Sequence, residues 1–107
     1  MSDELTNKKL LKRMILDMYY NLTIKDISNI ALVVNVANRT GKSTSKVNCK
    51  DVVFKLKYPK EGDHIYDYVD FSYYNRKNGL FISSSEIIMV DLVNSIKQVY
   101  AKAVNDL

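Results

Sequence analysis

The chain has 107 residues, a usual length for one domain, so we expect a single domain over residues 1–107. Apolar residues make up 47% of the chain and charged residues 26%, a balance that excludes a long disordered segment. The net charge of +4 is concentrated, because residues 39–60 hold seven basic side chains and Asp51 as their one acidic residue. Such a block is typical of a protein that contacts a polyanion, although a solvated lysine-rich face has the same composition.

Targeting segments and metal sites find no support in the sequence. The longest apolar runs, residues 30–34 and 87–90, are too short to cross a bilayer, and residues 1–9 lack the core of a signal peptide. Cys49 and His64 are the only residues of their kinds, too few for a structural zinc site. We therefore expect a cytoplasmic protein without membrane contact, metal or cofactor. No nucleophile motif accompanies His64, so we do not predict an enzyme.

Two helices are expected in the first third of the chain. Apolar residues recur at three- and four-residue spacing from Asp3 to Tyr20, as on one face of an amphipathic helix. Thr23 is a suitable N-cap for a second helix. Residues 30–37 are ambiguous, because they alternate like a strand and also fit a buried helix.

The segment from Val33 to Val52 favours the helical interpretation. Ala37 is followed four residues later by Gly41, and Val47 follows six residues after that. This spacing resembles the helix-turn-helix motif, which implies that Ala37 lies where two helices meet, Gly41 lies in the turn and Val47 anchors the recognition helix. We expect that helix to end between residues 51 and 56, where an alternating strand pattern begins.

A hairpin and a long helix are expected in the rest of the chain. Residues 65–74 alternate as a strand, Asn78 and Gly79 form a hairpin signal, and residues 80–83 return as the partner strand. Arg76 and Lys77 at the tip resemble the basic wing of winged helix-turn-helix proteins. Residues 83–86 match a capping box, which predicts that the last helix begins there.

The order of elements resembles winged helix-turn-helix proteins of bacteria and of their plasmids and phages. The resemblance implies a mainly α fold with a small β hairpin and a long C-terminal helix. It also implies a homodimer that binds double-stranded DNA, as a transcriptional regulator or with a partner protein of a partition or conjugative-transfer complex. The expected DNA-binding residues are Arg39, Lys42, Ser43, Thr44, Ser45, Lys46, Asn48, Lys50, Arg76, Lys77 and Asn78. The expected dimer interface is Met89, Val93, Ile96, Tyr100 and Val104.

An alternative is a two-layer α+β domain that serves as a binding module. Its four-stranded antiparallel sheet would consist of residues 29–37, 50–58, 65–74 and 80–83, with helices at both ends of the chain. Such a domain suits a phage-type protein inhibitor or a single-stranded nucleic-acid binder. The binding platform would then consist of Tyr66, Tyr68, Tyr74, Lys55 and Lys57.

Overall fold

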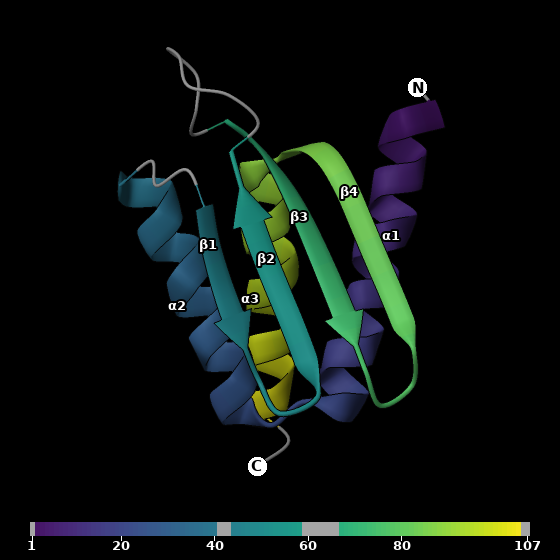
Figure 1. Cartoon of the computed structure of the whole chain (residues 1–107), viewed down its shortest axis with the longest axis vertical. Coiled ribbons are helices and arrows are strands. Elements are labelled where there is room, and N and C mark those ends of the chain that lie inside the picture. The colour runs from purple at the N-terminus through teal and green to yellow at the C-terminus, as the bar shows by residue number, and fades with distance from the viewer. Residues whose placement is uncertain (1, 41–43, 59–66, 106–107) are drawn as a thin grey trace.

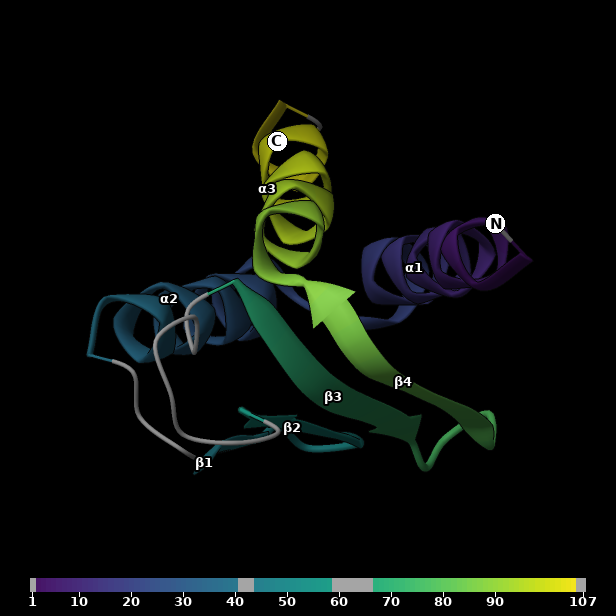
Figure 2. The same ribbon diagram turned by 90° about the horizontal axis from the view of Figure 1, so that it is seen from above.

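The protein is a two-layer α+β structure. The computed structural model describes residues 2–40, 44–58 and 67–105. Its elements are α1 (Ser2–Asn21), α2 (Ile24–Thr40), β1 (Thr44–Asn48), β2 (Val52–Lys57), β3 (Tyr68–Asn75), β4 (Leu80–Ile88) and α3 (Met89–Asn105). The strands form one antiparallel sheet in the order β1-β2-β3-β4, and the helices lie together on one of its faces (Figure 1). Figure 2 shows α3 between α1 and α2, and none of the helices in the described residues lies on the opposite face of the sheet.

The two N-terminal helices form where the apolar periodicity predicts them. Leu11, Met14 and Met18 are buried along one side of α1. α2 begins after the expected N-cap, because the Thr23 hydroxyl accepts a hydrogen bond of 3.2 Å from the Asp26 amide. The Asp26 carboxylate accepts one of 3.2 Å from the Thr23 amide in return. This cap starts a helix that continues through residues 30–37, which settles their ambiguity.

The core lies between the helix layer and the inner face of the sheet. Alternate strand residues point inward, and Phe54 and Phe71 stack there with ring centroids 6.0 Å apart. The largest fully buried side chains come from both layers: Met14, Met18, Ile27, Ile30, Val34, Val52, Phe54, Leu56, Tyr73, Ile82, Leu92 and Ile96. Each helix therefore packs its apolar side on the sheet. Within the described residues, no helix is long and apolar enough to span a bilayer.

The predicted winged helix-turn-helix fold is wrong, because residues 44–48 form β1 instead of a recognition helix. A helix here would bury Val47 with no apolar neighbour at helical spacing on its C-terminal side, where Lys50 and Asp51 lie. As a strand, the segment pairs Val47 with Phe54 of β2, while Lys46 remains exposed. Pairing with β2 thus satisfies the backbone and buries the only aliphatic residue of the segment.

The hairpin is confirmed, but its second strand is longer than predicted. Gly79 adopts a φ of 77° in the turn, a conformation that glycine permits without strain. The predicted capping box of residues 83–86 is wrong, because Ser83 and Ser84 continue β4 opposite β3, and α3 begins only at Met89. A bulge opposite Asp70 interrupts the pairing, which resumes with Val69 opposite Ile87. At the bulge the Asp70 carboxylate accepts a hydrogen bond of 2.6 Å from the amide of Glu86, whose φ is 55°.

The alternative architecture describes the sheet better, with one error. Its four antiparallel strands and terminal helices are present. Residues 29–37, however, belong to α2, and the first strand is residues 44–48. The error has a simple cause, because β-branched residues favour strands locally, while burial of Ile30, Val34 and Ala37 on one side stabilises the helix.

Candidate functional site on the open face of the sheet

The face of the sheet that no helix covers carries basic and aromatic side chains. Strand alternation places these residues opposite the core-facing ones, and we call the surface the open face. Figure 2 shows this face turned away from all three helices. Its members along β1 to β4 are Lys46, Asn48, Val53, Lys55, Lys57, Asp70, Ser72, Tyr74, Phe81 and Ser83.

The strand register arranges most of the open face into two neighbouring rows across the sheet. The aromatic row consists of Asn48, Val53, Tyr74 and Phe81. In it, Tyr74 and Phe81 form an edge-on pair with ring centroids 6.3 Å apart. These side chains are 39% and 60% exposed, so much of each aromatic surface contacts solvent. The row therefore offers exposed rings for stacking with a planar ligand.

The lysine row lies beside the aromatic row and consists of Lys46, Lys55, Ser72 and Ser83. Lys46 and Lys55 are direct cross-strand partners and both are exposed. Like charges in this relation repel each other, and the serines beside them carry no compensating charge. Lys57 lies one row further and has Asp70 as its cross-strand partner on β3. The two lysines of the row thus form a site that an anion would stabilise.

Two turns at one end of the sheet form a second basic region, which we call the turn rim. It consists of residues 49–51, between β1 and β2, and residues 76–79, between β3 and β4 (Figure 1). The Arg76 amide donates a hydrogen bond of 2.7 Å to the Asp51 carbonyl, and the Arg76 guanidinium donates one of 2.9 Å to the Lys50 carbonyl. Lys50, Arg76 and Lys77 are all exposed. The rim thus carries three exposed cations on turns whose backbones are joined by hydrogen bonds.

A buried carboxylate holds the turn rim against the helix layer. Asp17 of α1 is 8% exposed and accepts hydrogen bonds from the Tyr73 hydroxyl at 2.6 Å and from the Asn75 amide group at 2.9 Å. Its other oxygen accepts bonds from the amide groups of Asn78 at 2.6 Å and Asn21 at 2.9 Å. Four donors therefore solvate the buried charge, and the network joins α1 to the β3-β4 turn.

Cys49 lies in the turn rim but is poorly suited to nucleophilic chemistry. Its thiol is half-buried next to Asp26 of α2. Burial raises the pKa of Cys49 from 9.0 to about 11, and the charge of Asp26 and its hydrogen bond with the thiol act in the same direction. The thiol therefore stays protonated near neutral pH. In the part of the chain that the structure describes, no three His, Cys, Asp or Glu side chains are placed to share a metal ion.

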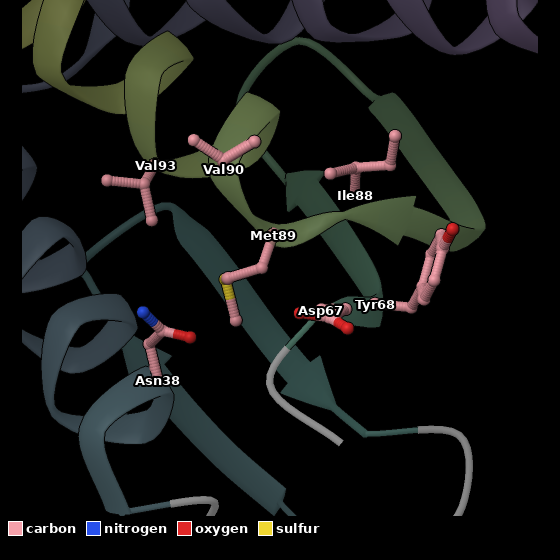
Figure 3. A pocket seen from close by; sticks show the side chains of 7 residues that line it. All are labelled: Asn38, Asp67, Tyr68, Ile88, Met89, Val90 and Val93. Carbon is pink, nitrogen blue, oxygen red and sulfur yellow. The ribbon is translucent and has the colours of Figure 1, made fainter. Parts of the chain in front are cut away.

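A separate cavity of about 380 Å³ lies where α2 ends and α3 begins. Figure 3 shows its lining residues: Asn38, Asp67, Tyr68, Ile88, Met89, Val90 and Val93. Tyr68 belongs to this end of the sheet, six residues along β3 from Tyr74 and about 20 Å away at the strand rise. The two tyrosines therefore do not share a platform, contrary to the sequence-based alternative, and Tyr66 lies outside the described residues.

No relative guides the interpretation of these sites. No family model matches the chain, and comparisons with curated proteins and with solved structures find no significant match.

The structure disperses the residues predicted to contact DNA. Arg39 is exposed at the end of α2, and Lys42 and Ser43 lie outside the described residues. Thr44 and Ser45 begin β1, with Ser45 on the same side as buried Val47. The remaining predicted residues divide between the open face and the turn rim: Lys46, Asn48, Lys50, Arg76, Lys77 and Asn78. Of these, Asn78 is engaged by Asp17.

The predicted dimer interface is also divided. Met89 and Ile96 are buried in the core of the protomer, so they are not available to a partner, and Val93 is half-buried. Tyr100 and Val104, each 40% exposed, remain on the surface of α3. A homodimer through these last two residues stays a prediction.

Phe81 and Val53 are the apolar members of the open face that sequence reasoning missed, and Ser72 and Ser83 are polar members that it also missed. The signal for Phe81 was present, because the Asn-Gly turn sets the hairpin register and brings Phe81 opposite Tyr74. Val53 could not be assigned to a surface before the position of β1 was known, since it fits equally in a strand or in the expected end of a recognition helix. Both residues extend the aromatic row across three strands.

Proposed function

We propose that this protein binds single-stranded nucleic acid on the open face of its sheet. The observation that carries the proposal is the exposed pair Tyr74 and Phe81 beside the like-charged pair Lys46 and Lys55 on one uncovered face. Aromatic rings interleaved with cations are the usual composition of single-strand binding surfaces. Here the two kinds of side chain come from neighbouring rows of one rigid sheet.

The aromatic row suits the base of a nucleotide, and the lysine row suits its phosphate. A base that stacks on Tyr74 or Phe81 contributes on the order of 1–3 kcal/mol, largely independent of sequence. A phosphate beside Lys46 and Lys55 relieves their mutual repulsion and releases condensed counterions, which favours binding at low salt. The chain has no need of catalytic groups or a cofactor for this function.

A single strand fits the surface better than the duplex expected from the winged fold. The bases of a duplex are stacked on each other and cannot stack on Tyr74 or Phe81, whereas single-stranded bases are free to do so. The recognition helix that motivated duplex binding is replaced by β1. Duplex DNA is therefore the appropriate competitor in the test.

The experiment compares a labelled oligothymidylate with a mixed-sequence duplex of equal length, by fluorescence anisotropy across a salt series. We expect tighter binding of the single strand, and a loss on the order of 1–3 kcal/mol in Phe81→Ala or Tyr74→Ala. Lys55→Ala should reduce the slope of log K against log salt by about 0.7 if it removes one phosphate contact.

A matched control is the variant Tyr20→Ala, because Tyr20 is 75% exposed on α1, in the helix layer. It removes an exposed ring without changing the open face, so we expect unchanged affinity. Equal binding of duplex and single strand, or equal affinities of Phe81→Ala and Tyr20→Ala, would overturn the proposal.

A further inference from the structure

We infer that the turn rim is a second phosphate-binding region, so that the nucleic-acid strand runs along the β-strands instead of across them. The inference rests on the proposed function and adds the path and extent of the bound strand. On this path the strand enters at Lys50 and Lys77, crosses the aromatic row and continues over Lys55. A strand that ran across the sheet along the lysine row would not reach the rim.

The first support is the position of the aromatic row between two groups of cations. Lys50 lies two residues beyond Asn48, and Arg76 lies two residues beyond Tyr74. On the other side, Lys55 follows Val53 by two residues along β2. Two residues of a strand span about 7 Å, which is the spacing between Val53 and Lys55. Lys50 and Arg76 lie in the turns that follow β1 and β3, so cations are present on both sides of the row. A base stacked in the row therefore has a cationic region on each side for its neighbouring phosphates.

The second support is the rigidity of the rim. Its two turns are joined through the backbone by Arg76, as described above, and the Lys77 amide donates a hydrogen bond of 2.9 Å to the Asn75 side chain. Asn78 is fixed to the Asp17 carboxylate at 2.6 Å. The backbone that presents Lys50 and Lys77 is thus preorganised, which reduces the entropy lost when a ligand binds.

The third support is the distribution of charge along the sheet. At the end opposite the rim, Asp70 lies beside Lys57 in the register, and Glu86 is exposed at the bulge. A polyanion is repelled from this acidic end and attracted to the rim, where Lys50, Arg76 and Lys77 outnumber Asp51, the one acidic residue of the two turns. The nearby carboxylates of Asp17 and Asp26 are hydrogen-bonded to Asn78 and Cys49. This change of charge along the sheet favours a nucleic-acid strand that lies parallel to the β-strands. The phosphates nearest the rim would be neutralised most.

The test is the double variant Lys50→Ala/Lys77→Ala, titrated with oligothymidylate and, separately, with oligouridylate. Arg76 is left intact because it braces the Lys50 carbonyl. We expect affinity to fall about tenfold at moderate salt and the salt slope to fall by about 1.4, corresponding to two lost phosphate contacts. The two ligands compare DNA with RNA, because they offer phosphates and pyrimidine bases alike but differ in the 2′-hydroxyl group of the sugar and the methyl group of thymine.

The control is Lys9→Ala/Lys12→Ala, which removes the same charge from exposed positions of α1. We expect it to change affinity by less than about twofold, the effect of net charge alone. If the wild-type protein does not bind single strands, the proposed function fails. If it binds and Phe81→Ala weakens binding, but the rim variant matches the α1 control, the path along the β-strands is overturned and the proposed function stands.

Photo-crosslinking gives a second readout that needs no variant. A strand with one photoreactive thiouridine at either end is bound to the wild-type protein, and the attached peptides are mapped by mass spectrometry. Attachment of one end to the rim and of the other to β2 beyond Lys55 supports the path. Attachment of the two ends to β1 and β4 overturns it.

Discussion

The hydroxyl of Tyr73, in the middle of the sheet, donates a hydrogen bond of 2.6 Å to the carboxylate of Asp17 in α1. Burial, and next the hydrogen bond to Asp17, raise the pKa of Tyr73 well above its usual value, so the phenol remains a donor. Asn75 and Asn78 donate to the same carboxylate. One side chain of α1 thus determines where the β3-β4 turn lies, and with it the turn rim.

Asp17→Ala should destabilise the protein by about 3 kcal/mol. The variant leaves the hydroxyl of Tyr73 and the amide of Asn75 without their acceptor, and both side chains are fully buried. A buried donor without a partner costs roughly 1–3 kcal/mol, so two of them account for the expected loss. Urea unfolding followed by circular dichroism measures it.

The control for this network is a pair of tyrosine variants on the same strand. Tyr73→Phe removes one bond to a buried carboxylate and should cost about 1.5–3 kcal/mol. Tyr74→Phe removes an exposed hydroxyl and should change stability by less than about 0.5 kcal/mol. Equal effects of the two substitutions would show that the Asp17 network does not stabilise the fold.

Gly79→Ala should cost about 1 kcal/mol through backbone conformation alone. Gly79 has a backbone φ of 77°, a conformation that residues other than glycine adopt only at an energetic cost. An added Cβ would meet no atom within 4 Å, so no steric clash adds to this cost. Gly79→Asn should therefore be less destabilising than Gly79→Ala, because asparagine tolerates this conformation better. Denaturant midpoints of the two variants test this order, and a larger loss for asparagine would contradict it.

Alkylation of Cys49 should report the raised pKa of its thiol. Because the pKa of Cys49 is about 11 in the folded protein and 9.0 without its surroundings, the native rate with iodoacetamide should still rise steeply between pH 9 and 10. In urea the rate should level off above pH 9. A native rate that levels off at the same pH as the unfolded one would contradict the burial of this thiol.

The raised pKa of Cys49 also makes the free energy of unfolding decrease at alkaline pH. The native state keeps the Cys49 proton at pH values where the unfolded chain has lost it, so the contribution of this group is fully present below pH 9 and is lost as pH rises towards 11. Cys49→Ser should weaken this alkaline loss. The comparison is made by urea unfolding at pH 8 and pH 10.

Local patterns were sufficient to predict α1, the start of α2 and the turn of the β3-β4 hairpin. The periodicity of Leu11, Met14 and Met18, the cap at Thr23 and the turn at Gly79 each depend on residues close in sequence. The β1-β2 hairpin was missed because its turn, residues 49–51, contains no glycine or proline, and because β1 has Val47 as its one aliphatic residue. A strand pattern was therefore recognised only from residues 50–56 onward, and the helix-turn-helix spacing determined the prediction for residues 44–48.

Longer-range pairing explains the other errors. Residues 83–86 satisfy a capping pattern locally, but cross-strand pairing of Ser83 with Ser72 keeps them in β4. The Asp17 network was invisible because Tyr73 lies 56 residues away in sequence. For the candidate site, the basic composition can be read from the sequence, whereas its division into two rows required the strand register.

Lys46→Glu should stabilise the protein while it impairs nucleic-acid binding. The substitution replaces the like-charged cross-strand pair of Lys46 and Lys55 by an opposite-charged one, which is favourable by roughly 0.2–1 kcal/mol. It also introduces a negative charge where the proposed function requires a phosphate, so affinity should fall and the salt slope should decrease. A gain in stability together with a loss of affinity is the result expected if Lys46 serves binding and not the stability of the fold.

The matched substitution is Lys9→Glu, the same charge reversal at an exposed position of α1. It should leave binding nearly unchanged, because it lies in the helix layer. Urea unfolding and anisotropy titrations of both variants, at low and at high salt, separate the two effects, since the stability gain of Lys46→Glu should shrink as salt screens the new pair. If Lys46→Glu instead loses stability and binds nucleic acid unchanged, Lys46 stabilises the fold and does not contact the ligand. The lysine row would then not belong to the binding surface.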